Sequence, residues 1–282
     1  MMAQTQSGPP LIDELHALVQ RHEVVARCGK VVWRTLGQGK PLVLLHGGHG
    51  NWLHWARNLQ ALACHRRLWL PDMPGYGDSD PVSESTLGQL VQGLTDSLDS
   101  LLGHGATMDL AGFSFGGLVA ASLAAQRGGI DRLILLGPAG HGGRRRPGAD
   151  LLGWRAAAQA GDACALEQTM RHNLLAHMLH DEHSADALAL QIHTEACLRT
   201  RFHSRPISRA GGLQSWLAQA GRPALLIWGE HDATADPPAL AAQLQTSHPT
   251  SAAHVVPGAG HWVQFESPAA VNRLMGEWLK AP

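Results

Sequence analysis

The stretch Gly112-Phe113-Ser114-Phe115-Gly116-Gly117 places one serine between two aromatic residues and a set of glycines. The apolar run "MDLAG" precedes it and the helix-like segment "GGLVAASLAAQ" follows it. A strand that turns abruptly into a helix strains the residue at its apex, and neighbouring glycines leave room for the close approach of the backbone. We therefore expect the Ser114 hydroxyl to be exposed at a turn. The Phe115 amide would lie at the positive end of the following helix, where it suits an oxyanion.

A serine hydroxyl is a poor nucleophile until a base removes its proton, and the base needs a third group to orient it. Two later segments supply such groups: Asp232 follows the apolar run "LLIW" and His261 follows "HVVPGAG". The chain order serine, aspartate, histidine, each at the end of an expected strand, matches that of one known nucleophile-turn architecture. Glu230 and Asp236 flank Asp232, and we interpret them as solvated or capping residues.

The elements that must position these residues alternate between short apolar runs and helical patterns. A hairpin is expected around Gly29 and Lys30, and continuous apolar strands then recur along the chain, as in a parallel sheet covered on both faces. Helical patterns between them include 86–102, 116–126 and 269–279. This alternation predicts an α/β protein with a doubly wound sheet.

One long interval, from about residue 140 to 221, contains only helical pattern and is too long for an ordinary connection. We expect it to be a helical cap, or lid, over the carboxyl ends of the strands. The predicted organisation is a core of residues 24–140 and 222–282, a cap of residues 141–221 and an N-terminal extension of residues 1–23.

The composition excludes several classes of protein. The 282 residues are 44% hydrophobic and 16% charged, with a formal net charge of −1. Nothing in that balance attracts nucleic acid or an anionic membrane. The N-terminus has no secretory pattern and no apolar run could span a bilayer. Four scattered cysteines suit free thiols in a reducing compartment. These features predict a cytoplasmic protein that acts on a small molecule, and they are compatible with a homo-oligomer.

With these residues in these positions, the chain resembles the α/β-hydrolase-fold enzymes over roughly residues 24 to 280. "LLHGGHG" resembles their His-Gly loop, "PDMPGYGDSD" their Asp-x-x-Gly-x-Gly-x-Ser loop, and "IWGEHD" and "GAGHW" their acid and histidine segments. The resemblance implies that Ser114 is the nucleophile, His261 the base and Asp232 the orienting acid. It also implies that the backbone amides of Gly48 and Phe115 form an oxyanion hole. A serine at position 114 excludes the dehalogenases, which use an aspartate there.

The substrate pocket is less well indicated. His49, Phe113 and Trp262 are candidate lining residues because of their positions beside the oxyanion loop, the serine and the base. The phenylalanines on either side of Ser114 favour an apolar acyl or alcohol site. Four histidines crowd one expected cap helix: His172, His177, His180 and His183. The last three of them would share one face of that helix. No carboxylate or cysteine completes a usual zinc spacing there, so neither a metal nor a cofactor is expected.

Hydrolysis of a carboxylic ester through an acyl-enzyme is the reaction we expect from this set of residues. The alternative is a carbon–carbon hydrolase of the meta-cleavage type, because "GHWVQFE" followed by "NRLM" is similar to a segment of that group. Such an enzyme needs a cation for the substrate carboxylate, and the candidates are Arg171, Arg199, Arg201 and Arg205. A third reading is a binding protein that keeps the fold without the chemistry.

Overall fold

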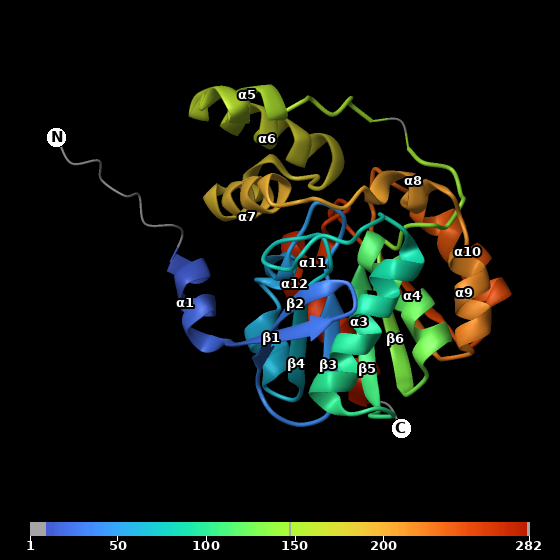
Figure 1. Cartoon of the computed structure of the whole chain (residues 1–282). Coiled ribbons are helices and arrows are strands. Elements are labelled where there is room, and N and C mark those ends of the chain that lie inside the picture. The colour runs from blue at the N-terminus through green and yellow to red at the C-terminus, as the bar shows by residue number, and fades with distance from the viewer. Residues whose placement is uncertain (1–9, 147, 281–282) are drawn as a thin grey trace.

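Eight strands form a single sheet in the order β1-β2-β4-β3-β5-β6-β7-β8 in the computed structural model, which describes residues 10–146 and 148–280 (Figure 1). β1 and β2 pair antiparallel, as do β2 and β4, and every later pairing is parallel. The strands are β1 (Gln20–Ala26), β2 (Gly29–Leu36), β3 (Pro41–Leu45), β4 (Arg67–Asp72), β5 (Met108–Phe113), β6 (Ile130–Leu136), β7 (Ala224–Gly229) and β8 (Ala252–Val256). The predicted hairpin and doubly wound sheet are confirmed.

Successive side chains of the central strands enter opposite hydrophobic cores, one on each face of the sheet. In β3, Leu42 and Leu44 belong to one core, whereas Val43 and Leu45 belong to the other. This two-residue alternation with both faces apolar is why the strand reads as a continuous hydrophobic run.

Helices cover both faces of the sheet. One face carries α1 (Pro10–Leu18), α2 (Leu59–Ala63) and α12 (Pro268–Lys280); the other carries α3 (Leu87–Leu102), α4 (Phe115–Arg127), α9 (Leu213–Ala220) and α10 (Pro237–Ser247). Thr86 begins α3 by accepting a hydrogen bond from the Gln89 amide, as a good helix N-cap does. The helices expected at 86–102, 116–126 and 269–279 are confirmed as α3, α4 and α12.

Between β6 and β7 the described chain forms α9 and four further α-helices. We call these four the insert helices: α5 (Arg155–Ala160), α6 (Ala163–His177), α7 (Ala187–Leu198) and α8 (Ser204–Arg209). A short 3-10 helix, η2 (Glu182–Ser184), joins α6 to α7. Asp162 and Asp186 accept hydrogen bonds from the amides three residues on and so begin α6 and α7. Buried residues of α6 and α7, such as Met170 and Ile192, join one of the two hydrophobic cores. In Figure 1, α5, α6 and α7 form a separate layer above the strands.

The limits of the predicted segments stay predictions, although two features bear on them. α9, at the end of the long helical interval, packs on α4 beside the sheet rather than among the insert helices. Within the predicted N-terminal extension, α1 buries Ile12 and Leu15, and residues 1–9 lie outside the described part. Among the described residues, no helix combines the length and apolar character that crossing a membrane requires.

Candidate active site

Ser114 occupies the turn between β5 and α4 with φ +53° and ψ −116°, a backbone conformation that residues other than glycine rarely adopt. Hydrogen bonds on both sides hold it there. Its amide donates to the Leu136 carbonyl at 2.8 Å, and its carbonyl accepts from the amides of Gly117 and Ala139, each at 2.9 Å. The strain is therefore sustained by the surrounding backbone, and the side chain keeps partial exposure to solvent.

The glycines beside the serine are required by close backbone contacts. A Cβ on Gly112 would lie 2.2 Å from the Gly116 carbonyl oxygen. A Cβ on Gly116 would lie 2.3 Å from the His46 carbonyl oxygen. Because these contacts are with backbone atoms rather than flexible side chains, any larger residue would push β5, α4 and the loop after β3 apart.

Ser114, His261 and Asp232 form a continuous chain of hydrogen bonds. His261 Nε2 lies 2.8 Å from Ser114 Oγ, and His261 Nδ1 lies 2.8 Å from Asp232 Oδ2. Both His261 and Asp232 are buried. If Nδ1 carries the proton toward the carboxylate, Nε2 is left as an acceptor for the serine proton. The fold thus brings together the three residues that the sequence singled out from three separate strand ends.

Thr234 completes the environment of Asp232, a role that was not predicted from the sequence. Its backbone amide and its hydroxyl each donate to Asp232 Oδ1 at 2.7 Å. Burial by itself would raise the pKa of Asp232, but the neighbouring His261 and these hydrogen bonds outweigh it, so the pKa lies below its usual value. The carboxylate is therefore ionised at neutral pH. The spacing Asp-x-Thr, typical of an Asx turn, was the available signal.

Two backbone amides, those of Gly48 in the loop after β3 and of Phe115 at the start of α4, are left unused, whereas the amides beside them are occupied. The Gly47 amide donates to His54 Nδ1 at 3.1 Å, and the Ser114 amide is taken by Leu136. Within the described part of the chain, neither the Gly48 nor the Phe115 amide takes part in a hydrogen bond of the loops, turns or side chains. A Cβ on Gly48 would lie 3.7 Å from Phe115 Cβ, so the two residues are neighbours. Paired free amides of this kind can hold a negatively charged oxygen.

The three residues predicted to line the pocket differ in their surroundings. His49 is half-buried with φ +52°, and burial together with Arg155 and His203 lowers its pKa. Phe113 is fully buried, with its ring 5.0 Å from that of His261. Trp262 is also fully buried, and its Nε1 donates to the His54 carbonyl at 2.9 Å. Contact of any of them with substrate stays a prediction.

Two histidines that the sequence analysis did not single out for this site lie around His261. The ring of His177, at the end of α6, is centred 5.6 Å from the His261 ring, and burial lowers its pKa to about 3. His54, in the 3-10 helix η1 (Trp52–Trp55), is fully buried between Phe113 and Trp262, and burial holds its pKa well below the usual value. Both are neutral at physiological pH. Their place beside His261 follows from tertiary packing and has no signal in the local sequence.

The expected helix with three histidines on one face is wrong, because α6 ends at His177. The amides of Met178 and Leu179 both bond the Leu174 carbonyl, which closes the helix before His180. His172, His180 and His183 then diverge: their neighbours are the Asp150 carbonyl, the His231 ring and Asp181 respectively. Among the described residues, no three histidine, cysteine, aspartate or glutamate side chains are placed to hold a metal ion.

The four candidate arginines have exposed side chains. Arg199 pairs with Asp78 at 2.5 Å, and the Arg201 guanidinium bonds the carbonyls of Gly77 and Ser79. Arg171 and Arg205 lie on the outer surface of the insert helices. None of these four positions supplies a desolvated cation.

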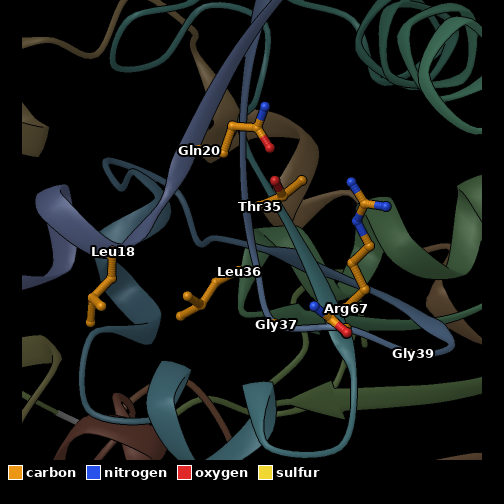
Figure 2. Close-up of a pocket in the computed structure, with 8 residues that line it drawn as sticks. Leu18, Gln20, Thr35, Leu36, Gly37, Gly39 and Arg67 are labelled. Carbon is orange, nitrogen blue, oxygen red and sulfur yellow. The ribbon is translucent and has the colours of Figure 1, made fainter.

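A hollow of about 560 Å³ lies elsewhere on the molecule, beside the ends of β1 and β2 (Figure 2). Leu18, Gln20, Thr35 and Arg67 are among its lining residues. None of the lining residues comes from the turns after β5, β7 and β8 that carry Ser114, Asp232 and His261. The hollow therefore lies apart from the side chains of Ser114, His261 and Asp232.

Comparison with known proteins identifies the fold family. A family model described as the alpha/beta hydrolase fold matches residues 40–268. The dihydrolipoyllysine-residue acetyltransferase component of the acetoin cleaving system of Pseudomonas putida is 32% identical over 271 residues, covering 88% of this chain and 66% of that protein. This chain therefore spans just under two thirds of that relative.

Two further similarities concern proteins of nearly the same length as this chain. A 2-hydroxy-6-oxononadienedioate/2-hydroxy-6-oxononatrienedioate hydrolase of Pseudomonas putida is 29% identical, covering 88% of this chain and 91% of that protein. Naproxen esterase from Bacillus subtilis superposes with a TM-score of 0.75 at 23% identity, covering 96% of both chains. At that identity the structural likeness establishes the fold alone.

Proposed function

Because the chain belongs to the α/β-hydrolase fold family, we propose that it is a serine hydrolase that cleaves a small carboxylic ester through an acyl-enzyme. The observation that carries the proposal is the chain of hydrogen bonds from Ser114 through His261 to Asp232, each link 2.8 Å long. We assign these residues as nucleophile, base and orienting acid. The insert helices would then act as a cap over the reacting groups.

The first half of the reaction forms the acyl-enzyme. His261 Nε2 takes the proton of Ser114 as Oγ bonds to the ester carbonyl carbon, and the carbonyl electron pair moves to the oxygen. The amides of Gly48 and Phe115 would stabilise that oxyanion. When it collapses, the carbon–oxygen bond to the alcohol breaks and His261 returns the proton to the departing oxygen. Ionised Asp232 stabilises the imidazolium throughout.

The second half repeats these steps with water as the nucleophile. Water gives a proton to His261 Nε2, and its oxygen bonds to the acyl carbon. Ser114 then leaves and recovers the proton, which releases the carboxylic acid. No step requires a metal or a cofactor, since the proton and the electron pairs all stay within these groups.

A carbon–carbon hydrolase of dienoate ring-fission products is the second candidate function. The observation in its favour is the 29% identity to a hydrolase of that class over nearly the whole chain. Against it, Phe113 precedes the serine where that group usually has an asparagine. The exposed Arg171, Arg199, Arg201 and Arg205 also do not offer a carboxylate a buried partner. We therefore place ester hydrolysis first.

Labelling with a fluorophosphonate probe tests the shared part of the proposal. The wild-type protein should be labelled on Ser114, and Ser114→Ala should remain folded, unlabelled and slower in turnover by about 10⁴-fold or more. A folded wild type that resists labelling would instead be the non-catalytic binding protein. Turnover of a p-nitrophenyl ester panel beside a ring-fission dienoate then separates the two chemistries. Rapid dienoate cleavage with slow ester turnover would reverse our order.

A further inference from the structure

The insert helices bring one buried hydroxyl against the unused amides near Ser114. Ser204 is the first residue of α8 and is only 4% exposed. A Cβ built on Gly48 would lie 2.7 Å from Ser204 Oγ, and the same point is 3.7 Å from Phe115 Cβ. The hydroxyl thus lies against Gly48, and any side chain at position 48 would collide with it.

Ser204 is held in this position by the segment before it. The Arg201 amide donates to the Gly75 carbonyl at 2.8 Å, and the His203 amide donates to Ser85 Oγ at 3.1 Å. Between these two anchors, the Phe202 ring packs 5.7 Å from Phe115 and 5.7 Å from Tyr76. The start of α8 is therefore fixed to the loop after β4 and to the start of α4.

Tyr76 is the polar neighbour of Ser204. Its ring is fully buried, and burial raises the pKa of the phenol well above its usual value, against a smaller opposing effect of the nearby Ser204 hydroxyl. No hydrogen bond of ordinary geometry joins the phenol hydroxyl to any described residue, and Ser204 is the hydroxyl beside it. A phenol that stays protonated is a donor, and a serine hydroxyl can accept one hydrogen bond while donating another. If the unpartnered phenol turns to donate to Ser204 Oγ, the Ser204 proton is free for a second acceptor.

We propose that Ser204 is a third hydrogen-bond donor to the oxyanion, beside the amides of Gly48 and Phe115, and that Tyr76 is the residue that positions its hydroxyl. The inference rests on the proposed function, because it needs an oxyanion formed at Ser114. In this arrangement the insert helices supply one hydrogen-bond donor to the oxyanion, and the loop after β3 and the start of α4 supply the other two. The site is then complete only when α8 is seated on the loops after β3 and β4.

The test uses the rate at which a fluorophosphonate labels Ser114, because the phosphoryl oxygen of the probe occupies the oxyanion position and no substrate need be known. Removing one donor from an oxyanion hole slows reaction by about 100-fold or more. We expect Ser204→Ala to slow labelling by about that factor, and Ser204→Cys, which keeps the volume but donates weakly, to slow it nearly as much. Ser208→Ala, on the same helix, is the matched control and should label at the wild-type rate.

Tyr76→Phe separates a positioning role from a structural one. We expect a loss of about 3- to 10-fold in kcat for a p-nitrophenyl ester with KM nearly unchanged, because the donor matters in the transition state. The double variant Tyr76→Phe/Ser204→Ala should be no slower than Ser204→Ala alone. Additive losses would show that the two hydroxyls act independently and would remove Tyr76 from the proposal.

The outcomes distinguish the inference from the proposed function. Wild-type labelling with unchanged rates in Ser204→Ala and Ser204→Cys would overturn the inference and leave the serine hydrolase intact. A slow Ser204→Ala with a fast Ser204→Cys would mean that Ser204 acts by packing, which also overturns it. A wild type that does not label would overturn the proposed function and this inference together. If Ser204→Ala does not fold, the volume-conserving Ser204→Cys and Tyr76→Phe still decide.

Discussion

At the scale of single residues, the support given to Asp232 separates its two oxygens by role. Oδ2 faces His261 Nδ1, whereas Oδ1 receives both hydrogen bonds from Thr234. A buried carboxylate that accepts several hydrogen bonds is held ionised and in one orientation. The threonine thereby acts on His261 mainly through the aspartate, although its hydroxyl oxygen also lies 3.3 Å from His261 Nδ1.

Thr234→Val tests this indirect role by removing the hydroxyl while keeping the side-chain shape and the backbone amide. One charge-assisted hydrogen bond to a buried group is lost, so we expect the free energy of unfolding to fall by about 1.5–3 kcal/mol. Turnover should fall by less than about tenfold, because Asp232 still contacts His261. Asp232→Asn, which disturbs the imidazole tautomer, should cost about 10⁴-fold in kcat. Urea unfolding measures the stability of the two variants, and ester kinetics measure their turnover. A Thr234→Val variant as inactive as Asp232→Asn would contradict the separate roles of Thr234 and Asp232.

At the scale of elements, the turn from β5 into α4 stores conformational strain to expose one side chain. The Ser114 backbone has φ +53°, and flanking glycines let β5, α4 and the loop after β3 meet. A residue with a Cβ held in such a region costs about 1–3 kcal/mol, and the surrounding hydrogen bonds hold it there. The fold therefore gives up stability at this turn.

Ser114→Gly and Ser114→Ala make a matched pair that measures this strain. Both remove the hydroxyl and should abolish labelling and turnover. Only glycine removes the Cβ, so Ser114→Gly should unfold at a higher urea concentration than Ser114→Ala. Its free energy of unfolding should be larger by about 1 kcal/mol, after allowing for the greater freedom of glycine in the unfolded chain. Equal stabilities of the two variants would show that the turn is relaxed.

The same elements show which features of the site the sequence could predict. Runs such as 41–45 and 224–229 are apolar throughout because both faces of the sheet are covered, and this local pattern was enough to predict the strands. Ser114, Asp232 and His261 stood out because each follows such a run. Thr234, His54, His177 and Ser204 did not, because their positions depend on how separate segments pack. The premature end of α6 at His177 likewise follows from bonds to the Leu174 carbonyl that the histidine spacing did not reveal.

At the scale of the whole molecule, several histidines are buried in the neutral form. Burial is the largest cause in each case: it lowers the pKa of His46 and His193 to about 4 and that of His177 to about 3, from an ordinary value of 6.5. For His46, Asp72 and the Gly47 carbonyl oppose this effect and Arg34 adds to it. For His177, Asp232 opposes it, whereas His261, Arg145 and His193 add to it. His54 is shifted in the same direction.

These buried histidines predict that the protein loses stability in mild acid. Between pH 6.5 and about 4 the unfolded chain binds protons at these positions and the folded protein does not, so acid favours unfolding. Each histidine contributes up to about 1.4 kcal/mol per pH unit, and the three with stated values together contribute roughly 4 kcal/mol per unit. Over this window the loss approaches the stability of about 5–15 kcal/mol that a domain has at neutral pH, so the protein should lose most of its stability there. Urea unfolding at pH 7, 6 and 5 measures the slope.

Two variants show whether the slope comes from the buried groups. His193→Gln removes one buried site of proton uptake and should reduce the slope by about 1.4 kcal/mol per pH unit, whatever it does to stability at pH 7. The exposed His65, changed to glutamine, should leave the slope as it is in the wild type. A free energy of unfolding that stays constant from pH 7 to pH 5 would mean that water reaches these imidazoles or that nearby groups rearrange on protonation. The buried histidines would then not set the acid limit of the fold.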